Sequence, residues 1–165
     1  WRRESKLVHF PGGRNINPAG KAHTNTAIQP KGGIFVYESY HHGGRRRKAF
    51  TAAYLYDAKA NSLQPIAKGD HRAAVAGSQD FVKSAPVSLV LVSDLSRFGN
   101  IADHTKLMAA VDAGIVCQNI NIFCAATGLA TVPRATMDQA ALKRILKLTD
   151  SQLPIMNNPV GYPRE

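Results

Sequence analysis

The stretch Val111-Asp-Ala-Gly-Ile-Val-Cys-Gln-Asn-Ile-Asn-Ile-Phe-Cys-Ala-Ala-Thr-Gly-Leu-Ala-Thr131 decides the fold of this chain. It predicts most of a long helix over Asp103–Thr127, followed by Gly128 as a C-terminal cap. Apolar side chains go more than halfway round that helix, with Ala and Gly between them: Leu107, Met108, Val111, Ile115, Val116, Ile120 and Phe123. A helix of this kind packs against protein on most of its surface. Its partner is either the rest of a monomer or a second chain.

Two cysteines, Cys117 and Cys124, lie on this predicted helix. Seven residues of helix separate them by about 10.5 Å. That distance exceeds the roughly 7 Å that a disulfide allows between Cα atoms. We therefore predict that both are buried, unbonded thiols.

The flanking sequence alternates between strand and helix patterns. Strands are predicted at Ala53–Asp57, at Val87–Ser93 and at Met156–Tyr162, where Pro159 calls for an edge or a bulge. A short helix is predicted at Asp70–Gly77. The alternation predicts an α+β or α/β layer fold with one central sheet.

A second amphipathic helix is predicted after Thr136-Met-Asp-Gln139, which has the form of a capping box. Its apolar side chains are expected to face inward and its basic side chains outward. The inward set is Leu142, Ile145, Leu146 and Leu148, and the outward set is Lys143, Arg144 and Lys147.

Length and composition are those of one globular domain over residues 1–165, with 44% apolar and 19% charged residues. Asp112, Gln118 and Asn119 interrupt the most apolar segment, so we expect no membrane span, which needs about 20 apolar residues. No apolar leader is visible at the start of the chain. We expect a cytoplasmic protein.

The formal net charge of +10 is unevenly distributed. Residues 1–50 hold ten Lys/Arg and two Asp/Glu, a net of +8, and residues 51–165 hold eleven and nine, a net of +2. Such a basic segment could bind an anion or a nucleic acid. The glycine-flanked cluster Arg45-Arg-Arg-Lys48 is interpreted as a solvated loop, so a nucleic-acid partner is not favoured.

Several motifs in one order resemble the nitroreductase superfamily. Residues 111–131 are similar to its D-A-G-x-x-x-Q-N and A-x-x-x-G-L-G-T helix, and Pro159-Val-Gly-Tyr-Pro163 is similar to its terminal strand. The stretch from Tyr54 to Pro86 resembles the branch that oxidises thiazolines and oxazolines in peptides. The resemblance covers residues 53–163 well, residues 14–37 loosely and the rest hardly at all.

The resemblance implies an α+β fold, with an antiparallel sheet wrapped by helices, and an intertwined homodimer with FMN at the interface. The predicted helix 103–127 then corresponds to the central dimer helix. The resemblance also implies that the loop after the G-L-G-T motif donates a backbone hydrogen bond to flavin N5. The candidates in that loop are Pro133, Arg134 and Ala135.

Two further parts of the flavin site are implied by weaker matches. Lys21–Gln29 resembles the family segment R-T-A-P-S-A-x-N, which places Thr26 and Gln29 at the polar edge of the ring. Arg3 and Ser5 match the spacing of the phosphate motif. Phe10, however, lies only five residues before Asn15, where relatives have an intervening helix. We interpret the N-terminal region as incomplete or misassigned, and a polypeptide complete as written is expected to bind FMN weakly.

These features predict an FMN-dependent oxidoreductase that works by ping-pong hydride transfer. NAD(P)H would reduce the flavin, and a small electron-poor acceptor such as a nitroaromatic or a quinone would reoxidise it. The flavin carries the chemistry, so no catalytic side chain and no metal is expected. The alternatives are a basic nucleic-acid-binding protein and a protein of this fold that has lost its cofactor.

Overall fold

The computed structural model describes residues 14–16, 22–24, 32–38, 52–58, 60–99 and 102–163, the first three ranges by their backbone alone. Its named strands are β1 (Arg14–Ile16), β2 (Ala22–Thr24), β3 (Gly32–Glu38), β4 (Ala52–Asp57), β5 (Ser62–Lys68), β6 (Val87–Asp94), β7 (Ala130–Thr131) and β8 (Gln152–Gly161). Its helices are α1 (Arg72–Ala76), α2 (Asp103–Ala126) and α3 (Gln139–Ile145), with short 3₁₀ turns η2 (Asp80–Ser84) and η3 (Leu95–Phe98).

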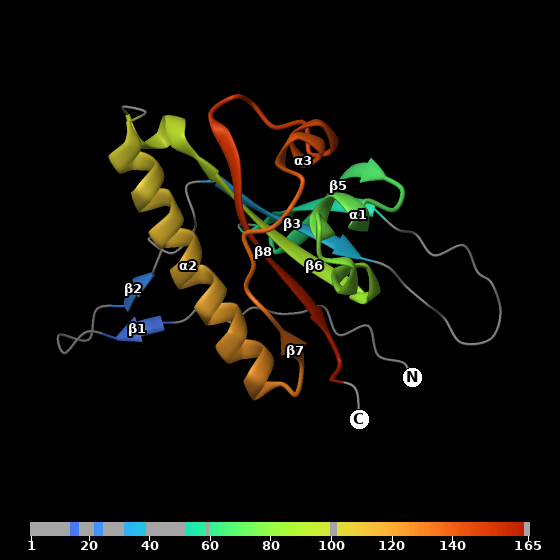
Figure 1. Ribbon diagram of the computed structural model, residues 1–165. Helices are drawn as coiled ribbons and strands as arrows, with labels where there is room; N and C mark the ends of the chain where they lie inside the picture. The colour runs from blue at the N-terminus through green and yellow to red at the C-terminus, as the bar shows by residue number, and fades with distance from the viewer. Residues whose placement is uncertain are drawn as a thin grey trace, which may run out of the picture.

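Six strands form one antiparallel sheet in the order β5-β4-β3-β6-β8-β7, and β1 pairs with β2 separately. Figure 1 shows α2 along one side of this sheet and α1 and α3 on the other. The predicted α+β fold, with helices around an antiparallel sheet, is confirmed.

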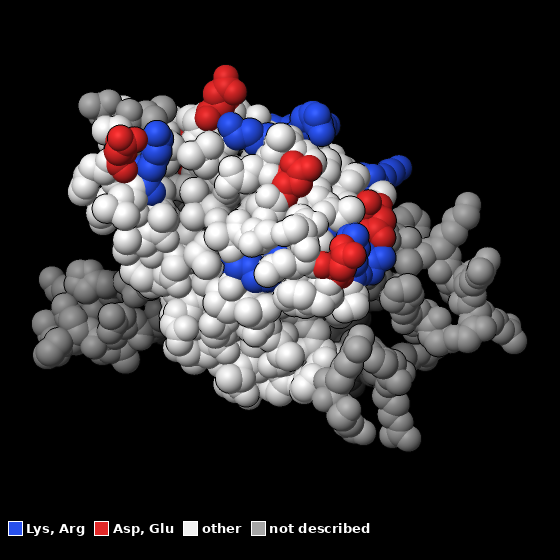
Figure 2. Space-filling view, viewed as in Figure 1, with Lys and Arg blue, Asp and Glu red and all other residues white. Residues whose placement is uncertain are grey.

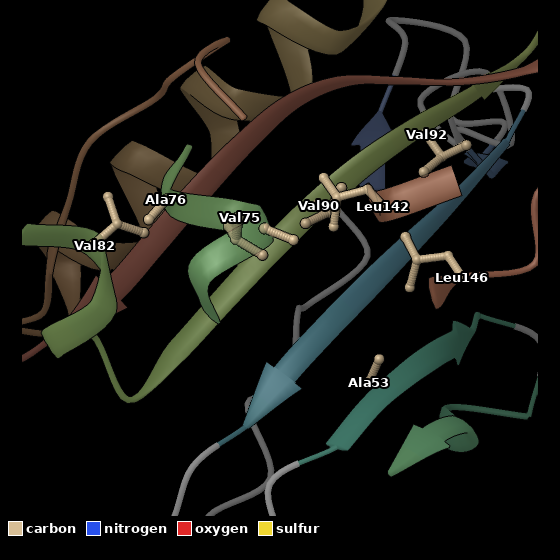
Figure 3. Packing of buried hydrophobic residues seen from close by; sticks show 9 residues of the cluster. Ala53, Val75, Ala76, Val82, Val90, Val92, Leu142 and Leu146 are labelled. Atoms are coloured by element: carbon tan, nitrogen blue, oxygen red, sulfur yellow. The ribbon is translucent and has the colours of Figure 1, made fainter. Parts of the chain in front are cut away.

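Strand β6 separates two hydrophobic cores because successive side chains of a strand point to opposite faces. Val90 and Val92 pack with α1 and α3 in one cluster, part of which Figure 3 shows. Leu89 and Leu91 pack with α2 in the other. This two-sided burial explains the continuous branched apolar run that predicted a strand at 87–93.

Helix α2 confirms the prediction for Asp103–Thr127 to within one residue, and Gly128 follows it with a φ of 71°. Its buried residues are Thr105, Ala109, Ala113, Val116, Cys117, Ile120 and Cys124. Both cysteines are free and buried, as predicted. Among the described residues, α2 is the one helix long and apolar enough to cross a membrane by length and composition, a test that core helices of soluble proteins also pass.

The predicted capping box at Thr136 is wrong. Helix α3 begins two residues later than that box requires, with Asp138 as the N-cap. The Asp138 carboxylate accepts a hydrogen bond from the backbone N–H of Ala141, whereas the Thr136 carbonyl is held by Asn157 of β8. The inward face is confirmed, since Leu142 and Leu146 are buried and Ile145 and Leu148 are partly buried.

Strand β8 begins at Gln152, four residues before the predicted strand. Pro159 lies in this inner strand, and the irregularity of pairing with β6 falls beside Leu91 and Val92. The expected edge or bulge at Pro159 is therefore wrong. Pro159 is tolerated where the partner strand is short: β7 pairs only with Val160 and Gly161.

Candidate flavin-binding loop

The predicted flavin loop, residues 132–135, lies between β7 and the turn before α3. It runs beside β8 and pairs with it at one point. The Arg134 N–H donates to the Asn157 carbonyl over 2.8 Å, and the Asn157 N–H donates to the Arg134 carbonyl over 2.7 Å. The Asn157 side-chain amide also donates to the Arg134 and Thr136 carbonyls, over 3.4 and 3.2 Å. Strand β8 thus holds the loop by backbone and side chain together.

The Arg134 side chain points into the protein and is 6% exposed. Its guanidinium donates to the carbonyls of Val75 and Ala76 over 3.3 and 2.8 Å. It also donates to the side-chain oxygens of Asn157 and Gln79, over 2.8 and 2.6 Å. Desolvation lowers the pKa of this guanidinium, but an arginine stays protonated in proteins. The sequence placed Arg134 beside a flavin, and the structure turns its side chain toward α1.

Helix α1 contacts the same segment at two further points. The Asp138 N–H donates to the Ala74 carbonyl over 2.8 Å. Gly77 has a φ of 55°, and a Cβ on it would lie 3.1 Å from the Met137 Cα. A side chain at Gly77 would therefore push the loop away from α1. Hydrogen bonds at Arg134, Thr136 and Asp138 therefore hold this segment to α1 and β8.

Backbone donors decide which candidate can contact flavin N5. Pro133 has no N–H, and the Arg134 N–H is bonded to Asn157. Ala135 is exposed, and within the described part of the chain its N–H has no hydrogen-bond acceptor. Of the three predicted residues, Ala135 alone offers a backbone donor to a ligand.

The other candidates, Arg3, Ser5, Thr26 and Gln29, lie outside the described residues. Sequence reasoning missed Gln79 and Asn157, which organise the loop. The pair Asn157-Asn158 inside an otherwise apolar strand was a usable signal, because fully buried amides need designated partners. Asn158 is 0% exposed and its amide bonds Asn121 of α2 and Thr131.

The face of α2 opposite the sheet remains apolar and exposed. Its exposed large side chains are Leu107, Met108, Val111, Ile115 and Ile122, with exposures between 39% and 61%. Figure 2 shows almost no charged side chains along the visible part of α2 beyond its N-terminal end. Exposed apolar residues grouped on one face of a helix are typical of surfaces that bind another protein.

Comparison with known proteins identifies the class. The sequence model of the nitroreductase family matches residues 23–162, so the chain belongs to this family. It is an oxidoreductase family, and the match includes the motif at 111–131 and all but the last residue of the motif at 159–163. No curated protein matches the chain significantly.

Solved structures share the fold. The chain resembles a putative nitroreductase of Ralstonia eutropha (TM-score 0.66, 24% identity, 81% of this chain and 58% of that one). It also resembles a putative nitroreductase of Anabaena variabilis (TM-score 0.66, 18% identity, 80% of this chain and 27% of that one). A third similar structure is the E. coli microcin synthetase McbBCD complex with truncated pro-MccB17 bound (TM-score 0.64, 15% identity, 81% of this chain and 52% of that one). The chain therefore spans well under two thirds of each of these relatives.

Proposed function

We propose that this protein binds FMN and transfers hydride equivalents from NAD(P)H to a small electron-poor acceptor, such as a nitroaromatic or a quinone. One observation carries the cofactor assignment: the exposed N–H of Ala135, without an acceptor among the described residues, stands on a loop fixed from both sides. This N–H supports the proposal because the nitroreductase resemblance implies a donor to flavin N5 in this loop.

The described residues include a group of the kind that binds a flavin ring. The ring needs a backbone donor for N5, and Ala135 can supply one. Bound FMN would accept and release the hydride equivalents, while the loop would fix the ring and tune its potential through that hydrogen bond. Arg3 and Ser5 for the phosphate, and Thr26 and Gln29 for the polar edge of the ring, remain proposals from sequence.

We propose further that the exposed apolar face of α2 is covered by α2 of a second copy. One side of the helix already packs on β6 and β8. The opposite side repeats large apolar residues at Leu107, Val111 and Ile115, one turn apart, which suits a helix partner. A homodimer in solution accounts for two features of α2: its exposed apolar face, and the polar residues Asp112, Gln118 and Asn119 on the same helix. Within this proposal the protein is cytoplasmic and no membrane is involved.

The test of cofactor binding is a titration of the purified chain with FMN, followed by flavin fluorescence and absorbance. Riboflavin serves as the control that lacks only the phosphate. Saturable one-to-one binding of FMN supports the proposal. Equal binding of FMN and riboflavin would show that the phosphate residues proposed from sequence do not act. Absence of FMN binding at millimolar concentration would favour the cofactor-less alternative.

A further inference from the structure

The interactions of Arg134 are unusual for a buried cation. Its guanidinium is bound by four neutral oxygens, from Val75, Ala76, Gln79 and Asn157. Among the described residues, no carboxylate lies within ion-pair distance of it. The Phe81 ring, 58% exposed, lies over the guanidinium with 5.6 Å from Cζ to the ring centroid.

Stability alone is a poor reason for an arginine in this place. Burying a cation without a counter-ion is costly, and apolar residues of similar volume often serve a core as well or better. What an arginine adds is geometry: a planar fork of donors that can bind several acceptors at fixed angles at once. Here the acceptors belong to three different segments, namely α1, the turn at Gln79 and β8.

We propose that Arg134 is a positioning residue that fixes residues 132–135 so that the Ala135 N–H is presented to the flavin, and that its own side chain binds no cofactor. The proposal rests on the proposed FMN function. The Arg134 side chain anchors the residue that directly precedes Ala135, so the anchored peptide group and the donating peptide group are adjacent in the chain. Gln79 and Asn157 act through Arg134, and so couple α1, η2 and β8 to the loop.

The test compares Arg134→Met with Arg144→Met. Met is unbranched and fills the space without donating. Arg144 is an exposed arginine on α3, so the same chemical change there is the matched control. The ligands are FMN and 5-deaza-FMN, in which a C–H replaces N5 and removes the hydrogen-bond acceptor. The ratio of their dissociation constants reports the N5 contact by itself.

The native protein and Arg144→Met should prefer FMN over 5-deaza-FMN by roughly 2- to 10-fold, the value of one hydrogen bond. In Arg134→Met the preference should fall toward unity, as it should in Ala135→Pro, which lacks the donor itself. In the flavin-free protein, hydrogen exchange of the bonded amides of Arg134 and Asp138 should quicken by roughly tenfold or more in Arg134→Met and stay unchanged in Arg144→Met.

Unchanged preference for FMN in Arg134→Met overturns the proposal, even if that variant melts earlier, because the residue would then be structural only. Native protein that binds FMN without preference overturns it too, since Ala135 would not be the N5 donor. Native protein that binds no FMN refutes the proposed function, and the positioning role falls with it. If Arg134→Met does not fold, Gln79→Ala decides. It removes one acceptor at an exposed residue, and the FMN preference must drop to an intermediate value.

Discussion

Two isoleucines on α2, five residues apart, should respond in opposite ways to the same substitution. Ile115 is 51% exposed on the proposed dimer face, whereas Ile120 is 3% exposed and packs in the core beside β6. Ile115→Asp should leave the folded monomer nearly as stable as before and weaken its association. Ile120→Asp should unfold the chain, because it places a carboxylate in an apolar core at a cost of several kcal/mol. The family resemblance implied only that the helix carrying both residues is the central dimer helix, and the structure separates the two residues.

The size of the effect at Ile115 follows from its exposure. Fully burying an isoleucine side chain contributes about 1.5–3 kcal/mol, and about half of this side chain is still exposed in the monomer. A symmetric dimer contains the residue twice. The apolar loss is therefore about 1.5–3 kcal/mol per dimer, which raises the dissociation constant roughly 10- to 100-fold. Desolvation of the two carboxylates adds to this loss.

The assay is sedimentation equilibrium over a concentration series, with thermal unfolding of each variant measured in parallel. Ala140→Asp is a matched control for charge, because Ala140 is exposed on α3, which packs on the other side of the sheet from α2. An Ile115→Asp variant that associates as tightly as the native chain would refute the assignment of this face. A native chain that is monomeric at high micromolar concentration would remove the dimer altogether.

Three further predictions concern stability. Leu142 of α3 is fully buried in the core, so Leu142→Ala should lower the free energy of unfolding by about 2–5 kcal/mol. Denaturant titration measures this loss, and a loss below about 1 kcal/mol would contradict the packing. Hydrogen bonds from Ser96 and Ser151 lower the pKa of Asp94, so its stabilisation is present above the unfolded pKa of about 3.9 and is lost as pH falls through the folded pKa. Acid titration of unfolding should show this loss in the native chain and a flatter profile in Asp94→Asn, and identical profiles would disprove it. Burial raises the pKa of Cys117 to about 11, so its contribution to stability should decline as pH rises from about 9 to 11. A soluble thiol reagent at pH 8 should label this cysteine only after denaturation. Rapid labelling of the native chain would show that the site is open.

The sequence predicted those parts of the fold that depend on local patterns. The apolar run at 87–93 and the long helix at 103–127 have lengths and compositions that leave little choice of structure, and both were placed to within one residue. Strand β5 was missed because its sequence, Ser62–Lys68, contains Pro65 and shows no clear alternation. It forms because it is an edge strand held by β4, where a proline can be accommodated.

The start of α3 shows a second limit of sequence reasoning. Thr136 and Asp138 can both cap a helix by composition, and Thr136 with Gln139 even has capping-box spacing. The choice is made by β8, because Asn157 binds the Thr136 carbonyl and draws that residue out of the helix. No local pattern encodes a contact across 21 residues.

The candidate loop was found by resemblance, but the roles within it required coordinates. Sequence treated Pro133, Arg134 and Ala135 alike. The structure distinguishes them by whether each residue has a backbone N–H without a hydrogen-bond acceptor, and by the direction of the Arg134 side chain. Gln79, 55 residues away from Arg134, could not be connected to the loop before the fold was known.

We propose that hydride equivalents pass through FMN in two separable half-reactions. The most direct test is anaerobic mixing of FMN-loaded protein with NADH or NADPH, followed by addition of a nitroaromatic or a quinone after the nicotinamide has been exhausted. We predict that the oxidised flavin absorbance bleaches in the first step and returns in the second. Flavin that remains oxidised with either nicotinamide, in protein shown to hold FMN, would contradict the claim.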